Sequence, residues 1–177
     1  VTAALKTAAL RTERPGIVAF EGAYHGLGYA PLAACGFKAS FREPFEAQLN
    51  PHVHFAPYPA TPDAVAECLA QVERRLATGQ IGAVLFEPLL GRGGVVVPPP
   101  GFLSELVALA RAHGALSIAD EIWTGLGRAG AMLRSVDDGA VADLVVLGKG
   151  LGASFPISAC IGTADAMSGW SRGGRVI

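Results

Sequence analysis

The chain has 177 residues, of which 51% are apolar, so it is long enough for one sizeable hydrophobic core and short for two ordinary domains. Its formal net charge of −1 gives no general attraction to nucleic acid or to an anionic membrane, and no apolar run approaches the roughly 20 residues of a membrane span, so we expect neither as a partner. Three widely spaced cysteines favour reduced thiols in the cytoplasm over a disulfide framework or a zinc site.

The first third of the chain predicts a helix, a strand and a long irregular stretch. Residues 2–11 are rich in alanine and predict a helix, which Pro15 and Gly16 end. Because this pattern already resembles the interior of a helix at the first residue, we expect the chain to be a piece of a longer protein. Residues 17–20 predict a strand, whereas residues 30–60 carry five prolines without clear periodicity and predict a long excursion over the surface.

Helices and strands alternate in the remaining two thirds. Thr61 is expected to cap a helix that ends at Gly79, and residues 102–113 and 164–169 predict two more helices. Strands are predicted at residues 81–86, 115–119, 144–147 and 157–162. This alternation predicts the α/β fold class, with a predominantly parallel sheet covered by helices.

Side chains able to take part in chemistry follow four of the predicted strands. They are Tyr24, His25, Glu87, Asp120, Glu121 and Lys149. The carboxyl ends of parallel strands meet at one edge of a sheet, where open α/β sheets bind their ligands, so we expect these side chains around one site. Lys149 stands between Gly148 and Gly150, where we expect a sharp turn that shields the amine partly from water and favours its nucleophilic form.

One lysine and one carboxylate are the minimal equipment of a pyridoxal 5'-phosphate site. The lysine forms an imine with the cofactor aldehyde, a buried aspartate such as Asp120 keeps the ring nitrogen protonated, and an aromatic ring such as Tyr24 stacks on the cofactor. Each residue also has a structural interpretation: Tyr24 as a packed loop aromatic, Glu87 as a partner of backbone amides, and Asp120 as the cap of the following turn. Their joint occurrence at strand ends favours the site.

Two other motifs point to different chemistry. Gly125, Gly127 and Gly130 match the dinucleotide fingerprint, but the loop begins about five residues after the predicted strand and no long helix follows, so a dinucleotide-binding module is not favoured. His52 and His54 have no acidic or cysteine partner nearby, so no metal site is expected.

Four blocks of sequence carry a recognisable pattern. They are residues 20–26, residues 86–88 with 93–95, residues 119–122 with 124–130, and residues 147–152. In order and spacing they resemble the class III aminotransferases, which are pyridoxal-phosphate enzymes of fold type I. The resemblance implies that residues 1–177 are the central part of the large, cofactor-binding domain, with the N-terminal segment and the C-terminal small domain absent.

The resemblance also implies roles around the cofactor. Lys149 would be the Schiff-base lysine and then the acid and base that move the proton, and Asp120 would pair with the ring nitrogen. Tyr24 would stack on one face of the ring, while Ile122 would pack against the other.

Four further residues are interpreted through the same resemblance. Glu87 would orient groups around the cofactor, and His25 would support the loop that carries Tyr24. Trp123 stands where many members have Gln, and Arg92 stands where ornithine- and 4-aminobutyrate-type members have Glu. In those members the Glu masks a substrate-binding arginine. Arg92 cannot mask an arginine in this way, so we expect an amino donor or carbonyl acceptor other than ornithine and 4-aminobutyrate.

The implied reaction moves an amino group from an amino acid or amine to a 2-oxo acid or aldehyde. The implied partners are a small-molecule amino donor, a carbonyl acceptor, and a second copy in a homodimer with the active site at the interface. Alternatives are an aminomutase, racemase or decarboxylase of the same superfamily, or a non-catalytic relative. Because parts of the family's phosphate site lie outside the sequence, we expect the chain alone to be weakly active or inactive.

Overall fold

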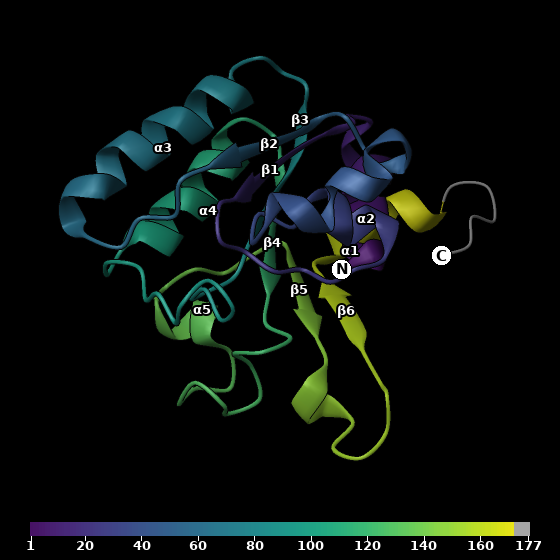
Figure 1. Cartoon of the computed structure of the whole chain (residues 1–177), viewed down its shortest axis with the longest axis vertical. Helices are drawn as coiled ribbons and strands as arrows, with labels where there is room; N and C mark the ends of the chain where they lie inside the picture. Colours follow the sequence, from purple (N-terminus) through teal and green to yellow (C-terminus); the bar gives the residue numbers. More distant parts are fainter. Residues whose placement is uncertain (172–177) are drawn as a thin grey trace.

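The structure, a computed structural model, describes residues 1–171, so the last six residues of the predicted domain lie outside the described part. The helices in this part are α1 (Thr2–Thr12), α2 (Tyr29–Ala33), α3 (Pro62–Leu76), α4 (Phe102–Ala112), α5 (Arg134–Asp137) and α6 (Ala164–Met167), shown in Figure 1. The strands are β1 (Gly16–Phe20), β2 (Val53–Ala56), β3 (Ile81–Phe86), β4 (Leu116–Asp120), β5 (Leu144–Leu147) and β6 (Ala159–Gly162). None of the described helices is long and apolar enough to cross a membrane.

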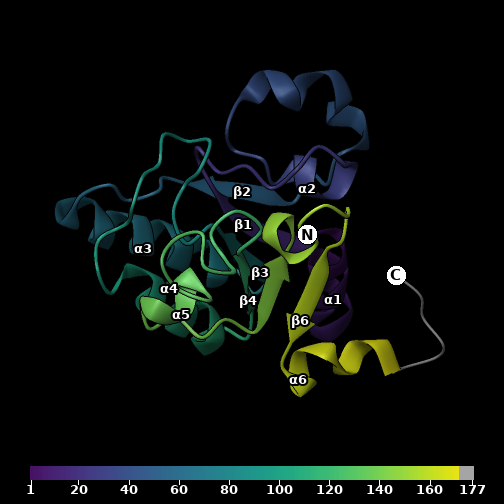
Figure 2. The same ribbon diagram turned by 90° about the horizontal axis from the view of Figure 1, so that it is seen from below.

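The strands of the described part form one sheet in the order β2-β1-β3-β4-β5-β6. Neighbouring strands from β2 to β5 pair in parallel, and β6 runs antiparallel to β5. Every residue of β1, β3 and β4 is buried, because α3 and α4 cover one face while α1 covers the other (Figure 2). The predicted α/β class with a predominantly parallel sheet is therefore confirmed, and the parallel strands direct their carboxyl ends to one edge.

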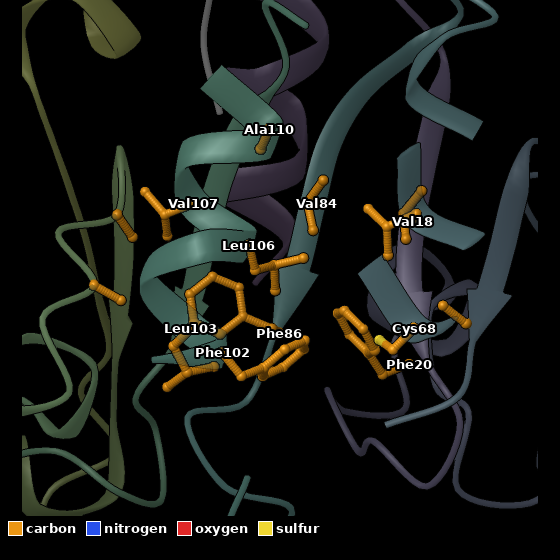
Figure 3. Close-up of a cluster of buried hydrophobic side chains, with 14 of the residues drawn as sticks. Val18, Phe20, Cys68, Val84, Phe86, Phe102, Leu103, Leu106, Val107 and Ala110 are labelled. Carbon is orange, nitrogen blue, oxygen red and sulfur yellow. The ribbon is translucent and has the colours of Figure 1, made fainter. Parts of the chain in front are cut away.

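Successive side chains of the central strands belong alternately to two separate hydrophobic clusters, one on each face of the sheet. Val84 and Phe86 of β3 point toward α3 and α4, whereas Leu85 points toward α1. Figure 3 shows the first cluster, in which Phe20 and Phe102 meet edge to face with ring centres 6.2 Å apart. Burying side chains of this size contributes about 1.5–3 kcal/mol each, so the central strands are a stable base for the loops at their ends.

The prediction for residues 30–60 was wrong in one respect. The stretch does run over the surface, but it also contains α2 and the edge strand β2, whose Val53 pairs with Ile17 of β1. The strand was missed because it has only four residues, and three of them stay partly exposed at the edge of the sheet. The short helix α5 was not predicted either.

The boundaries of the other elements agree closely with the predictions. The bounds of β3 and β5 are as predicted, β4 begins one residue later, and the predicted strand at residues 157–162 covers only Ala159–Gly162. Thr61 does precede the first turn of α3, but its side chain accepts no hydrogen bond from the helix, so Pro62 and the following Asp63 mark that start without a side-chain cap.

Candidate active site

A cavity of about 580 Å³ lies where the carboxyl ends of β1, β3, β4 and β5 meet. It is lined by all six residues predicted for the cofactor site and by four others: Tyr24, His25, Gly26, Glu87, Gly91, Arg92, Asp120, Ile122, Trp123 and Lys149. Residues far apart in the sequence are thus brought together by the parallel topology, as the strand-end argument predicted.

Asp120 and His25 form a buried pair at the floor of this cavity. The Nδ1 atom of His25 lies 2.7 Å from Oδ2 of Asp120, and the backbone N–H of Ile122 donates to Oδ1 over 3.2 Å. An N–H on Nδ1 donates to the carboxylate, and the buried Nε2 has no hydrogen-bond partner in the described part of the chain. The carboxylate is therefore fixed in orientation by two donors while it faces a cavity.

Glu87 is also buried, and its carboxylate joins two loops. Oε1 accepts from the backbone N–H of Tyr24 over 2.7 Å, and Oε2 accepts from that of Gly91 over 3.1 Å. Burial raises the pKa of Glu87 above its usual value, and the two amides and nearby His25 oppose this only in part. The hydroxyl of Tyr58 donates to the Glu87 carbonyl over 3.0 Å, which holds the main chain at the same point.

The side chains of Tyr24 and Arg92 stack on each other at the cavity wall. The guanidinium carbon lies 4.2 Å from the centre of the phenol ring, a cation–π distance. One face of the ring is therefore covered by arginine, and Tyr24 also lines the cavity. Next to this pair, Gly91 lies against the indole of Trp123, since a Cβ on Gly91 would come within 3.1 Å of the ring atom Cε3.

Lys149 opens the 3-10 helix Lys149–Leu151 directly after β5. Its φ of 40° lies in the left-handed region, an uncommon conformation for a residue with a side chain and one often found at functional sites. The expected shielding of its side chain is wrong for the chain as described: Lys149 is exposed. The reason is the connection between β5 and β6, which projects beyond the rest of the fold and carries the lysine with it (Figure 1).

Glu121 follows Asp120 in sequence but serves a different part of the fold. Its carboxylate is fully buried away from the cavity, where it accepts from the hydroxyl of Thr124 and from the backbone N–H and hydroxyl of Ser135, the last two over 2.7 and 2.8 Å. Adjacent positions at the end of a strand point in opposite directions, so only one of these two acids reaches the site. Glu121 anchors the loop that leads to α5.

The glycine fingerprint of residues 125–130 lies in that same loop. The backbone N–H of Leu126 donates to Met132, and that of Gly127 donates to Ala131, which closes a tight turn. The helix that follows, α5, has only four residues, so the loop lacks the long helix whose N-terminus binds a pyrophosphate. Among residues 1–171 no group of three or more His, Cys, Asp and Glu side chains is placed to hold a metal ion.

Residue reasoning alone did not find two lining residues, Arg92 and Trp123. Arg92 was noted only as a departure from the family, although the run of glycines around it after β3 was a signal for a loop that approaches another backbone closely. Trp123 lies three residues beyond the end of β4, and its approach to Gly91 depends on how the loops after β3 and β4 fold over the sheet.

The arrangement of a lysine amine, a buried carboxylate and an aromatic ring at the strand ends of a parallel α/β sheet is typical of enzymes that use pyridoxal phosphate. The sequence pattern of the family described as Aminotransferase class-III matches residues 1–176 of the chain. The chain belongs to this family, as its sequence blocks predicted.

Curated relatives and a solved structure agree with this assignment. The acetylornithine aminotransferase of Mycolicibacterium smegmatis is 43% identical over 85% of this chain, and the 4-aminobutyrate aminotransferase GabT of Escherichia coli is 34% identical over 97%. An amine transaminase from an uncultivated Pseudomonas species, crystallised in its PLP-bound form, superposes with a TM-score of 0.89 at 29% identity over 98% of the chain. The chain spans 36% and 41% of the two curated relatives and 43% of the solved chain.

Proposed function

We propose that this chain is the central part of the cofactor-binding domain of a longer aminotransferase that depends on pyridoxal phosphate. Such an enzyme moves an amino group from an amino acid or amine to a 2-oxo acid or aldehyde. The observation that carries the proposal is the cavity shared by Asp120, the last residue of β4, and Lys149, which follows the neighbouring strand β5. Family membership supports the same chemistry.

The residues of the cavity fit the cofactor. Asp120 is a buried carboxylate that faces the cavity and is held by the imidazole of His25 and one amide, so a cationic ring nitrogen would find a fixed acidic partner there. Ile122 and the phenol ring of Tyr24 line the cavity with apolar surfaces suited to a flat aromatic ring. When bound, pyridoxal phosphate supplies an electron-accepting ring that stabilises negative charge at the substrate carbon next to the amino group.

Each residue then has a definite task. Lys149 would hold the cofactor through its Nζ, and it would hold and move the substrate's proton at the same atom. Asp120 keeps the ring nitrogen protonated, and His25 holds Asp120 in orientation. Glu87 positions Tyr24 through the main chain and so sets the height of the aromatic ring over the cavity.

Borohydride reduction of the longer enzyme in the presence of pyridoxal phosphate tests this assignment. Reduction fixes the cofactor covalently to the amine that binds it, and peptide mapping then locates the modified lysine. We expect label on Lys149, no label in Lys149→Ala, and unchanged labelling in Lys6→Ala and Lys38→Ala, which remove the other two lysines of the chain one at a time. Label on Lys6 or Lys38, or on no residue of this chain, would contradict the proposal.

We further propose a cytoplasmic homodimer with the cavity near the subunit interface. Two features support it: Lys149 and Arg92 are exposed, and the nearby β5–β6 connection carries the exposed apolar side chains of Phe155 and Ile157. All three cysteines are free, as expected for a reducing compartment. Analytical ultracentrifugation of the longer enzyme should give the mass of a dimer; a monomer at micromolar concentration would count against this proposal.

A further inference from the structure

We infer that Arg92 binds the carboxylate of the substrate, so that the enzyme prefers donors and acceptors that carry a carboxylate group. This inference rests on the proposed function, because it names the substrate class for the same cavity. It is carried by three features of Arg92: a fixed main chain, a guanidinium with free donors, and its place among the charges of the cavity.

The main chain around Arg92 is held from several sides. Glu87 accepts from the N–H of Gly91, and the N–H of Val95 donates back to the Gly91 carbonyl over 3.2 Å. Gly93 lies so close to the next loop that a Cβ there would be 2.7 Å from the Gly22 carbonyl oxygen. A side chain that starts from so restrained a loop loses little freedom on binding a ligand.

The guanidinium of Arg92 is positioned by its contact with Tyr24, but no carboxylate of residues 1–171 balances its charge. Its central carbon lies over the Tyr24 ring, and no carboxylate of residues 1–171 forms an ion pair with it. The cation–π contact leaves its N–H groups without a hydrogen-bond partner within residues 1–171. Two parallel N–H groups in one plane match the two oxygens of a carboxylate, which a lysine amine does not.

The negatively charged side chains that line the cavity are buried, whereas the positively charged ones are exposed at its mouth. The carboxylates of Glu87 and Asp120 are buried, with 5% and 3% of each residue exposed, and both accept hydrogen bonds from the protein. The cations of Lys149 and Arg92 are exposed at the mouth. Since Lys149 is engaged by the cofactor and in proton transfer, Arg92 is the lining cation of the described chain that remains for an anionic group of the substrate.

Paired substrates test this inference in the longer enzyme with cofactor bound. Each pair differs only in a carboxylate replaced by a methyl group: 4-aminobutanoate with butylamine, and alanine with isopropylamine. In the wild type we expect a higher kcat/KM for the acid of at least one pair. In Arg92→Met, which keeps a long apolar stem, kcat/KM for that acid should fall about 10- to 100-fold while the amine changes little. An unchanged ratio in this variant would overturn the inference.

Two further variants separate charge from geometry and from general effects. Arg92→Lys keeps the charge but loses the paired donors, so it should recover only part of the preference. Arg128→Met removes an exposed arginine that does not line the cavity, and it should leave the ratio as in the wild type. A loss of preference in Arg128→Met as large as that in Arg92→Met would overturn the inference, because a general change of surface charge would then explain both.

A binding measurement decides the inference independently of catalysis. Butanoate, which has no amine to react, should bind the wild type at least about tenfold more tightly than Arg92→Met in titration calorimetry, whereas butan-1-ol should bind both alike. Equal butanoate affinities would overturn the inference even in an enzyme without transaminase activity. The affinity for pyridoxal phosphate should be the same in both proteins; a loss of cofactor affinity in Arg92→Met as large as the loss for butanoate would assign the arginine to the cofactor's phosphate instead.

Discussion

At the scale of single residues, Glu87 connects the chemistry of the cavity to the stability of the fold. Its carboxylate accepts one amide from each of two loops, yet burial raises its pKa above the usual value of about 4.5. A buried acid whose folded-state pKa is raised binds its proton more tightly in the folded than in the unfolded protein. Its contribution to stability is therefore greatest below the unfolded pKa and is lost as the pH rises through the folded pKa.

The substitution Glu87→Gln removes this pH dependence. It also turns one acceptor into an N–H₂ group that faces a backbone N–H, which costs about 1–3 kcal/mol in itself. We therefore expect the variant to be less stable than the wild type at pH 4 and to lose part of this disadvantage as the pH rises toward 7. Urea unfolding across that range measures the difference.

Glu105→Gln, in the exposed part of α4, is the control for the loss of a glutamate charge. A stability difference between wild type and Glu87→Gln that stays constant from pH 4 to pH 7 would show that Glu87 has no raised pKa in the fold.

Single residues also show how much of the site could be predicted from the sequence. Tyr24, Glu87, Asp120 and Lys149 were brought to one site by a simple rule, since each ends or follows a buried strand of a parallel sheet. The structural interpretations of these two acids are confirmed, because Glu87 does bind two backbone amides and Asp120 does accept from Ile122. The pairing of His25 with Asp120 was not predictable, because β3 lies between their strands and only the loop shape brings the imidazole to the carboxylate.

At the scale of elements, the loop of residues 91–94 depends on close backbone contact. Gly93→Ala would place a Cβ 2.7 Å from the Gly22 carbonyl and 3.0 Å from the Leu90 side chain. One of the two loops must then move. We expect a loss of about 1–3 kcal/mol in the free energy of unfolding, as for other overpacked sites, and a weaker preference for carboxylate substrates because Arg92 is displaced.

Gly28→Ala is the matched control for this substitution. Its Cβ would meet only Pro31, at 3.8 Å, an ordinary contact, and the backbone before α2 is extended. Urea unfolding should therefore detect little change. Equal stability of Gly93→Ala and Gly28→Ala would mean that the two loops do not rest against each other as tightly as the geometry requires.

The elements that sequence patterns predicted best are those with many buried residues. Each of the six residues of β3 is buried, and its predicted bounds agree with the structure. By contrast, β2 has one buried residue and α5 has four residues in all, so neither carries a periodic signal. Short edge elements are held by pairing with the rest of the fold rather than by their own sequence.

At the scale of the whole molecule, the cavity is open to solvent and its two cations are exposed. The relatives are more than twice as long as this chain, so we expect the rest of the longer enzyme to complete the site. We expect the isolated chain to show little or no steady-state transamination with pyridoxal phosphate, an amino acid and a 2-oxo acid.

Turnover by the purified chain at a rate near that of the longer enzyme would refute this expectation. Circular dichroism of the same sample checks that the chain is folded, so that inactivity reflects an incomplete site. Lys149→Ala in the longer enzyme gives the background rate against which the activity of the chain is judged.

The carboxylate of Glu87 accepts hydrogen bonds only from main-chain N–H groups, which every residue except proline provides. The side chains at positions 24 and 92 can therefore diversify without loosening the loops that present them. A library randomised at these two positions, with proline excluded at 24, should yield many folded proteins with altered substrate choice. Randomising position 87 should yield few folded proteins. The buried carboxylate of Glu87 must therefore be kept while the substrate specificity is changed.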